Sequence, residues 1–320
     1  PVDQYSSLFH YIWWTGIPSP YGPLWQALMV AINFVSGNQL LTGVIILKIV
    51  NLAGLAGVVW YVYRISGKQW LAWVVAANPV VLLNSVATPH TDIVLAALLL
   101  GAYYQSRTWM RGGLLGAAGL IKPHMLVFLP FLAKTWRGVL ALGSATVLAL
   151  GVLLLVLKPV VGFDWLPMLA AGQGGGVLGM ESLLMTWLLP KAPPHTVFLA
   201  SYVLFAACYG VILWLYCRRR LRQMPALAAA GLLVPLCLTG VLLPWHFVIP
   251  IVLLLICESR APVLLALAFT ALVMRSAQAV PQLLAILALL WAAYELGRWV
   301  YQGVSKRPPW AVRLAESIKL

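Results

Sequence analysis

The sequence is poor in charge. Only 9% of its 320 residues are Asp, Glu, Lys or Arg, and only 7 residues are acidic. Soluble domains carry about 25% charged residues, so this chain lacks the side chains that would cover a surface facing water. A hydrophobic content of 62% also excludes intrinsic disorder, which requires low hydrophobicity and high charge. The composition therefore predicts a protein that is surrounded by lipid.

Cysteine is also scarce, and its spacing excludes two kinds of site. The four cysteines lie inside or beside apolar runs, and none stands in a CxxC or Cys/His ligand pattern. A disulfide framework and a zinc site are therefore not expected. No clustered acidic ligand set and no nucleotide-binding glycine pattern occurs, so we expect neither a metal ion nor another cofactor.

Long apolar runs are abundant. Five of them approach the ~20 residues that a helix needs to cross the hydrocarbon core of a membrane. These runs are residues 39–63, 139–157, 196–216, 226–242 and 282–301. Shorter runs, interrupted by Pro, Gly or polar residues, lie between them, and we expect these to tilt, kink or pack in the protein interior. The sequence predicts one all-α transmembrane domain over residues 1–320, a polytopic helical bundle with broken helices and about eleven membrane-penetrating segments.

The basic residues indicate the orientation of this bundle. Cytoplasmic loops are enriched in Lys and Arg, and 16 of the 21 basic residues fall on one side if every run except 24–35 crosses. This pattern places residues 302–320 in the cytoplasm as a basic tail. It makes residues 1–38 and 158–195 extracytoplasmic loops, and within the first loop residues 24–35 are expected to form an interfacial helix. We expect an integral protein of the plasma (inner) membrane. Because no basic face with interleaved aromatic residues occurs, the net charge of +14 does not indicate nucleic-acid binding.

Histidine and acidic residues gather on the opposite side. All five histidines fall there, together with four of the acidic residues, and this predicts that the chemistry is extracytoplasmic. These residues are His10, His90, His124, His195, His246, Asp3, Asp92, Asp164 and Glu181.

Two polar breaks between apolar runs are candidate sites, and each has a plainer interpretation. His90 and Asp92 precede an apolar run and are expected to line a polar cavity, because ionisable groups at membrane depth usually mark a working site. Alternatively, Thr91 or Asp92 only caps the following helix. Lys122 and His124 flank Pro123 and are suited to an anionic lipid head; alternatively, Lys122 extends to the headgroup region.

Two further breaks and the aromatic N-terminal region complete the candidates. Trp245 and His246 form a third outward turn, and Arg275 lies where basic residues are otherwise rare. We predict that Lys122, His124 and Arg275 converge on one cavity. Tyr21 and Trp25 either anchor at the membrane interface or stack on sugar rings. Trp245 is alternatively only an interfacial anchor.

Four sequence motifs together resemble a known family. They are residues 17–25 (IPSPYGPLW), 77–83 (ANPVVLL) running into His90-Thr91-Asp92, 120–123 (LIKP) and 243–246 (LPWH). The combination is similar to the polyprenol-phosphate-mannose-dependent α-1,6-mannosyltransferases of bacterial envelopes, which belong to the GT-C membrane glycosyltransferases. In this family a His-Asn-Asp-like triplet often begins the helix after the Asn-Pro segment, and here Thr91 occupies its middle position.

The resemblance implies an activity and roles for the candidate residues. It implies inverting transfer of a hexose, mannose in this family, from a polyprenyl-phosphate sugar to a glycan or glycolipid acceptor. The catalytic candidates are Asp92, His90 and Asp3. Substrate-binding roles fall to Lys122, His124, Trp245, His246, Arg275, Tyr21, Trp25 and Glu181.

One departure from the family pattern concerns the catalytic carboxylate. GT-C enzymes place an Asp in the first extracytoplasmic loop after a first transmembrane helix, and this sequence is expected to begin inside that loop. Either that residue precedes Pro1, or Asp3 or Asp92 replaces it. The principal alternative function is a transporter or flippase of a lipid-linked or polar substrate, because broken helices also build transport sites.

Overall fold

The computed structural model describes residues 21–37, 39–133, 135–161, 194–238 and 244–257. All regular elements in these ranges are helical, so the predicted all-α class is confirmed. The α-helices are α2 (Pro23–Val35), α3 (Leu40–Ser66), α4 (Gln69–Ala76), α5 (Pro79–Leu82), α6 (Asp92–Tyr104), α7 (Thr108–Ile121), α8 (Trp136–Val161), α11 (Pro194–Cys217), α12 (Gln223–Leu233) and α13 (Val248–Ile256). Two π-helical segments, η2 (Leu83–Ala87) and η5 (Val234–Leu238), and two 3₁₀ segments, η3 (Pro123–Leu132) and η6 (Pro244–Phe247), complete the described fold.

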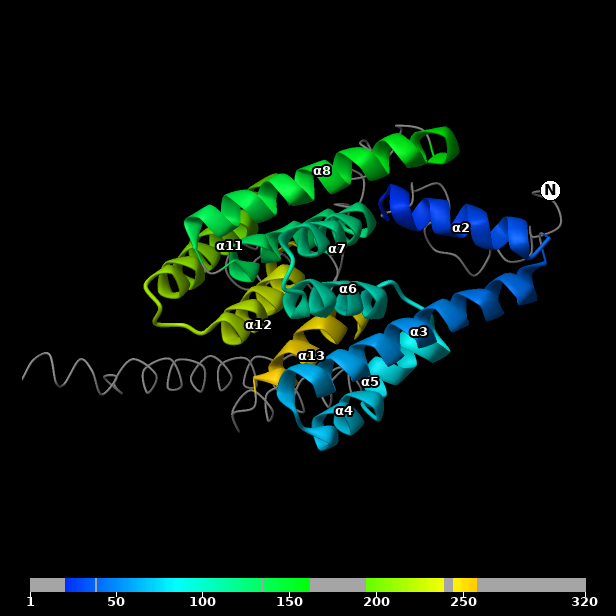
Figure 1. Cartoon of the computed structure of the whole chain (residues 1–320), viewed down its shortest axis with the longest axis horizontal. Coiled ribbons are helices and arrows are strands. Elements are labelled where there is room, and N and C mark those ends of the chain that lie inside the picture. Colours follow the sequence, from blue (N-terminus) through cyan, green and yellow to red (C-terminus); the bar gives the residue numbers. More distant parts are fainter. Residues whose placement is uncertain (1–20, 38, 134, 162–193, 239–243, 258–320) are drawn as a thin grey trace, which may run out of the picture.

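Three long helices, α3, α8 and α11, lie mostly on the outside of the bundle (Figure 1). Each is long and apolar enough to cross a membrane, and only 17%, 11% and 6% of their most apolar stretches are buried inside the protein. They match three of the five predicted long runs. Exposed leucine and valine on these helices fit a surface that faces lipid instead of water.

The shorter helices form the interior. Helices α6, α12 and α13 carry many of the buried apolar side chains, and every residue of α13 is buried. The 13 residues of α6 span about 20 Å, which is less than a membrane core. Burial by neighbouring helices explains how such short apolar segments are accommodated, as predicted. Within the predicted run 226–242, α12 continues into η5, and residues 239–242 lie outside the described residues. The predicted run 282–301 also lies outside the described residues.

The helices run between two opposite ends of the bundle. Helices α3 and α6 are parallel, because Gly54 lies against Val94 and Gly101 against Tyr61. At one end, which we call the Arg64 end, Arg64 at the end of α3 contacts Tyr104 at the end of α6. At the other, the Asp92 end, the first residue of α6 contacts Lys122, which follows α7. These two polar contacts therefore lie at opposite ends of α6.

The ten-residue 3₁₀ segment η3 is unusually long for its type. Pro123 and Pro130 lack backbone N–H donors, so regular α-helical hydrogen bonding is interrupted here. Side chains of neighbouring elements bond to its backbone carbonyls instead: the Tyr209 hydroxyl donates to the Val127 carbonyl at 2.8 Å, and the Gln223 amide donates to the Phe131 carbonyl at 2.8 Å. These contacts hold η3 in place and thereby position His124 near its start.

Candidate active site at the Asp92 end

Asp92 begins α6 and is almost completely buried. Its two carboxylate oxygens accept hydrogen bonds from Lys122 Nζ at 3.0 and 2.9 Å. Thr91, the residue before the helix, makes no capping side-chain hydrogen bond. The carboxylate is thus engaged in an ion pair, and the interpretation of Thr91 as a simple helix cap is wrong.

Lys122 reaches Asp92 because α7 ends beside it. Proline disfavours a helical conformation in the preceding residue, and Lys122, followed by Pro123, has φ −142° and ψ 114°. The extended backbone turns the lysine side chain into the protein, where only 8% of the residue is exposed. The alternative in which Lys122 extends to the lipid headgroups is therefore wrong.

The start of α2 covers this ion pair. The Gly22 N–H donates to the Ile121 carbonyl at 2.9 Å, and a Cβ atom at Gly22 would collide with the Leu120 carbonyl oxygen. This close approach places the Tyr21 ring 5.7 Å from Lys122 Nζ, within the range of a cation–π contact. Burial, with the nearby negative charge of Asp92, raises the pKa of Tyr21 to about 12. The Tyr-Gly dipeptide of the 17–25 motif therefore has a definite packing role.

Trp25 lies in the core. It is only 5% exposed, and its ring centroid is 6.1 Å from that of Tyr21. The structure thus presents Tyr21, and not Trp25, to the Asp92–Lys122 pair.

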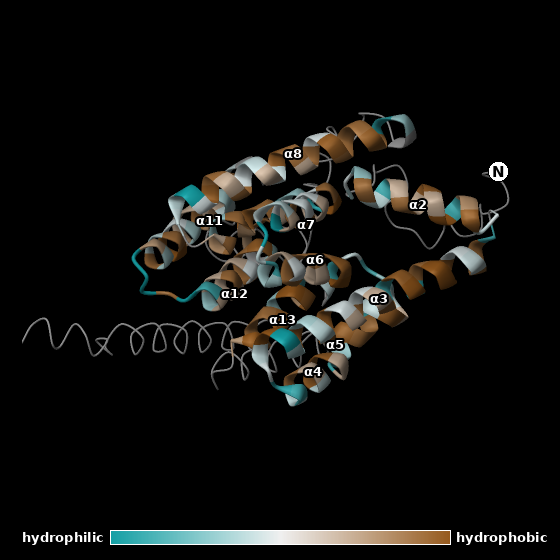
Figure 2. Ribbon diagram, viewed as in Figure 1, coloured by the Kyte–Doolittle hydropathy of each residue, from teal (hydrophilic) through white to brown (hydrophobic). Residues whose placement is uncertain are grey.

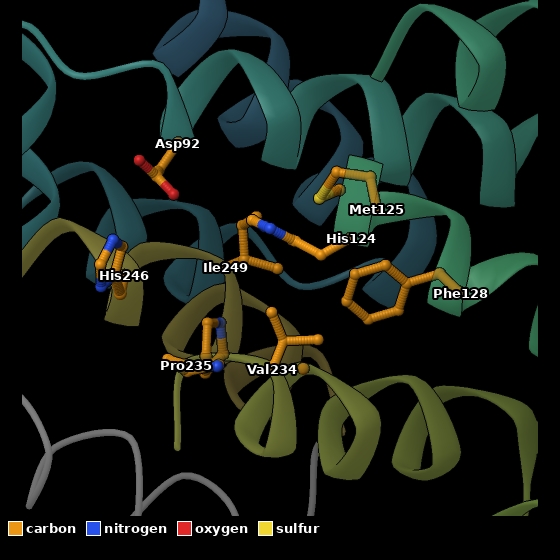
Figure 3. Close-up of a pocket in the computed structure, with 10 residues that line it drawn as sticks. Asp92, His124, Met125, Phe128, Val234, Pro235, His246 and Ile249 are labelled. Atoms are coloured by element: carbon orange, nitrogen blue, oxygen red, sulfur yellow. The ribbon is translucent and has the colours of Figure 1, made fainter. Parts of the chain in front are cut away.

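A pocket opens beside Asp92 (Figure 3). Asp92 and His246 lie at one side of it and Phe128 at the other, with His124 between them. The polar residues come from α6, η3 and η6, whereas the apolar wall comes mainly from η3, η5 and α13. The complete lining is Asp92, His124, Met125, Phe128, Gly231, Val234, Pro235, His246, Ile249 and Pro250.

His90 and Trp245 stack on one another next to this pocket but do not line it. Their ring centroids are 3.7 Å apart with an interplanar angle of 18°. Burial lowers the pKa of His90, the charge of Lys122 lowers it further, and that of Asp92 acts in the opposite direction. A neutral imidazole stacked on an indole is thus favoured, and it joins the turn before α6 to η6.

The structure brings together residues that are far apart in the sequence. Asp92, Lys122, His124 and His246 form one cluster, with Tyr21 against it and the His90–Trp245 stack beside it. Asp3, Glu181 and Arg275 lie outside the described residues, so the predicted convergence of Arg275 with Lys122 remains a prediction.

Sequence reasoning missed the apolar wall of the pocket. Met125, Phe128, Val234 and Ile249 are ordinary members of apolar runs, and nothing in their pattern distinguishes them from core residues. Pro235 was the one available signal. A proline within the run 226–242 indicates a local break, and η5 is that break, a π-helical segment of the kind often found at functional sites.

Within the described ranges, no three His, Cys, Asp or Glu side chains are grouped in a way that would hold a metal ion. The chemistry that this arrangement supports depends on one carboxylate, one ammonium and two imidazoles beside an apolar surface. Such a set can accept a proton and balance the charge of an anion.

Comparison with known proteins agrees with the sequence motifs. Residues 7–138 match the family described as "Alpha-(1->6)-mannopyranosyltransferase, N-terminal domain". Alpha-(1->6)-mannopyranosyltransferase A of Mycobacterium tuberculosis is 26% identical over 180 residues, which is 49% of this chain and 35% of that protein. Alpha-(1->6)-mannopyranosyltransferase B of Corynebacterium glutamicum is 25% identical over 209 residues, which is 54% of this chain and 34% of that protein.

The similarity extends over only part of each protein. A third relative, a probable alpha-(1->6)-mannopyranosyltransferase of Mycolicibacterium smegmatis, is 23% identical over 220 residues, or 55% of this chain and 38% of that protein. The chain thus spans little more than a third of the length of these relatives. No solved structure shows a significant match. Residues 7–138 are thus similar to the N-terminal domain of the alpha-(1->6)-mannopyranosyltransferase family that the motifs resemble.

Proposed function

We propose that this chain forms part of a membrane mannosyltransferase that uses a polyprenyl-phosphate mannose donor. The acceptor is a glycan or glycolipid hydroxyl, and the Asp92 end faces the extracytoplasmic side of the plasma membrane. The observation that carries the proposal is the buried Asp92–Lys122 pair, whose carboxylate lines, with two histidines, a pocket that has an apolar wall. The match of residues 7–138 to the mannosyltransferase family supports the choice of sugar.

The pocket has the two kinds of surface that such a donor requires. A polyprenyl-phosphate sugar carries an anionic phosphate between a polar sugar and an apolar chain. Lys122, His124 and His246 lie near Asp92 and would face the phosphate, whereas Phe128 and Ile249 would contact the first isoprene units. Tyr21, next to Lys122, would limit the space on the sugar side.

The proposed reaction is a direct displacement. An acceptor oxygen forms a bond to the anomeric carbon of mannose while the bond from that carbon to the phosphate oxygen breaks. The lipid phosphate leaves with the electron pair of the broken bond, and Asp92 accepts the acceptor proton. Lys122 and the histidines stabilise the negative charge that develops on the phosphate.

Lys122 has a second part in this proposal. While its ammonium holds both Asp92 oxygens, the carboxylate is a weak base, because protonation would forfeit the ion pair. A phosphate group in the pocket competes for the same ammonium. We infer that donor binding draws Lys122 towards the phosphate and leaves one Asp92 oxygen free to accept a proton.

The test is mannose transfer by the Asp92→Asn variant of the complete protein in membranes. Asparagine retains a carbonyl oxygen that can accept from Lys122 but is not a general base at neutral pH. The rate should fall by roughly 10²–10⁴-fold, the usual range for loss of a general base. Lys48→Met, which neutralises a half-buried lysine of α3 outside the pocket lining, is the control and should keep most activity.

Two outcomes would overturn the assignment of Asp92. Turnover near that of the wild type in Asp92→Asn would transfer the role of base to another acidic residue, such as Asp3. Transport of a lipid-linked sugar across vesicles without formation of a mannosylated product would favour the transporter alternative.

A further inference from the structure

We propose that Arg64, Trp60 and Tyr104 form a binding site for the headgroup of an anionic phospholipid at the Arg64 end of the bundle. The site lies at the opposite end of the bundle from the candidate active site.

The guanidinium group of Arg64 is held in a fixed position by aromatic side chains. Its Nε and Nη2 atoms donate to the hydroxyl oxygen of Tyr104 at 3.2 and 2.9 Å. Its central carbon lies 5.8 Å from the Trp60 ring centroid and 5.9 Å from that of Tyr104. The two rings are themselves in edge-to-face contact, with centroids 5.5 Å apart. The arginine is thus preorganised, which reduces the entropy lost when it binds a ligand.

This guanidinium retains hydrogen-bonding capacity. An arginine has five N–H donors, and the contacts with Tyr104 use two of them. Arg64 is exposed, and the one acidic residue in the described part of the chain, Asp92, is bound to Lys122 at the opposite end. The remaining N–H groups have the geometry to bind two oxygens of a phosphate together.

The surroundings indicate that the phosphate belongs to a membrane lipid. Trp60 and Tyr63 are 48% and 47% exposed on the apolar helix α3. Four other exposed tryptophans stand beside basic residues in the sequence, and exposed tryptophan next to Lys or Arg is typical of a membrane interface. These tryptophans are Trp70 near Lys68, Trp109 near Arg107 and Arg111, Trp136 near Arg137 and Trp214 near Arg218.

The same end carries several basic residues. Arg137 lies at the start of α8, and Arg218, Arg219, Arg220 and Arg222 lie between α11 and α12, where Figure 2 shows hydrophilic segments. Basic residues at a membrane surface attract anionic lipids. The occupant is therefore a phospholipid with a net negative headgroup, such as phosphatidylglycerol.

The experiment measures lipid retention by the purified protein after exchange into mixed phosphatidylglycerol and phosphatidylcholine. The wild type should retain phosphatidylglycerol preferentially, and Arg64→Gln should reduce its affinity by about tenfold, the effect of losing charge-assisted hydrogen bonds. Arg64→Lys keeps the charge but loses the planar fork, so it should also weaken binding. Tyr104→Phe, which keeps the ring and removes the anchoring hydroxyl, should have an intermediate effect.

Arg218→Gln is the matched control. Arg218 also lies over a tryptophan, with its central carbon 6.0 Å from the Trp214 ring centroid, but no tyrosine hydroxyl among the described residues bonds to it. An equal loss in Arg218→Gln and Arg64→Gln would show only a diffuse effect of surface charge and would overturn the site. Equal displacement of the lipid by inorganic phosphate would show a site for soluble anions and would overturn the lipid assignment.

Discussion

The two ends of the bundle use cationic side chains in opposite ways. At the Asp92 end, Lys122 is buried and bonded to both oxygens of a carboxylate. At the Arg64 end, Arg64 is exposed and is positioned by aromatic rings and a phenol hydroxyl. One cation is neutralised inside the protein, and the other keeps its charge available at the surface.

This difference follows from what surrounds each group. A buried charge without a partner is costly, so Lys122 requires Asp92, and each of the two residues makes the burial of the other possible. An exposed arginine at a membrane interface carries no such cost, and neighbouring rings are sufficient to orient it. The Asp92 end should therefore be sensitive to any single change of charge, whereas the Arg64 end should tolerate one.

The largest expected effect comes from removing Lys122. Lys122→Met leaves the Asp92 carboxylate buried without its donor, and loss of one partner from a buried pair costs about 3–5 kcal/mol. We expect a correspondingly lower free energy of unfolding in detergent, whereas Arg64→Gln should leave the unfolding midpoint almost unchanged.

The double variant Asp92→Asn/Lys122→Met sharpens this prediction. It removes both charges, so it should recover much of the stability that Lys122→Met loses, and a double-mutant cycle should give a large coupling energy. If the losses in the free energy of unfolding from the two single changes simply add in the double variant, Asp92 and Lys122 do not stabilise each other. The contrast between the two ends of the bundle would then fail.

The next largest effect should follow from Gly22→Ala. The added Cβ would meet the Leu120 carbonyl, which is backbone and cannot move aside easily. Overpacking of this kind usually costs about 1–3 kcal/mol. Because Tyr21 and Lys122 lie on either side of this contact, mannose transfer should decrease as well. Gly113→Ala is a matched control, since a Cβ at Gly113 would meet no atom within 4 Å; equal effects of the two changes would contradict the argument.

The sequence predicted the helical class and the three longest described helices because long apolar runs are a strong signal. These runs correspond to α3, α8 and α11. They left open whether each shorter run tilts, kinks or packs in the interior, because periodicity does not distinguish a lipid-facing helix from a buried one when both are apolar throughout.

The site was predictable in its residue types but not in its pairings. Ionisable residues are rare in this chain, so Asp92, Lys122, His124 and His246 stood out without any knowledge of the structure. Their spacing in the sequence could not show that Lys122 bonds to Asp92 or that His90 stacks on Trp245, since both contacts join different elements. These pairings depend on how the helix ends meet in space.

The smallest expected effect is a pH dependence at the Asp92 end. Burial lowers the pKa of His90 below its ordinary value of 6.5, so the folded protein favours the neutral ring. Above pH 6.5 the ring is neutral in both states, and its contribution to stability is fully present. As the pH falls below 6.5, the unfolded chain binds a proton before the folded protein does. The contribution to stability therefore decreases until the pH falls below the pKa of His90 in the folded protein.

His90→Phe retains a flat ring for stacking on Trp245 but does not titrate. Unfolding midpoints measured from pH 7.5 to 5 should therefore fall more for the wild type than for His90→Phe. Parallel pH curves for the two proteins would mean that His90 titrates equally in both states. In that case the stacked His90 ring would not be shielded from water as the buried Asp92–Lys122 pair is.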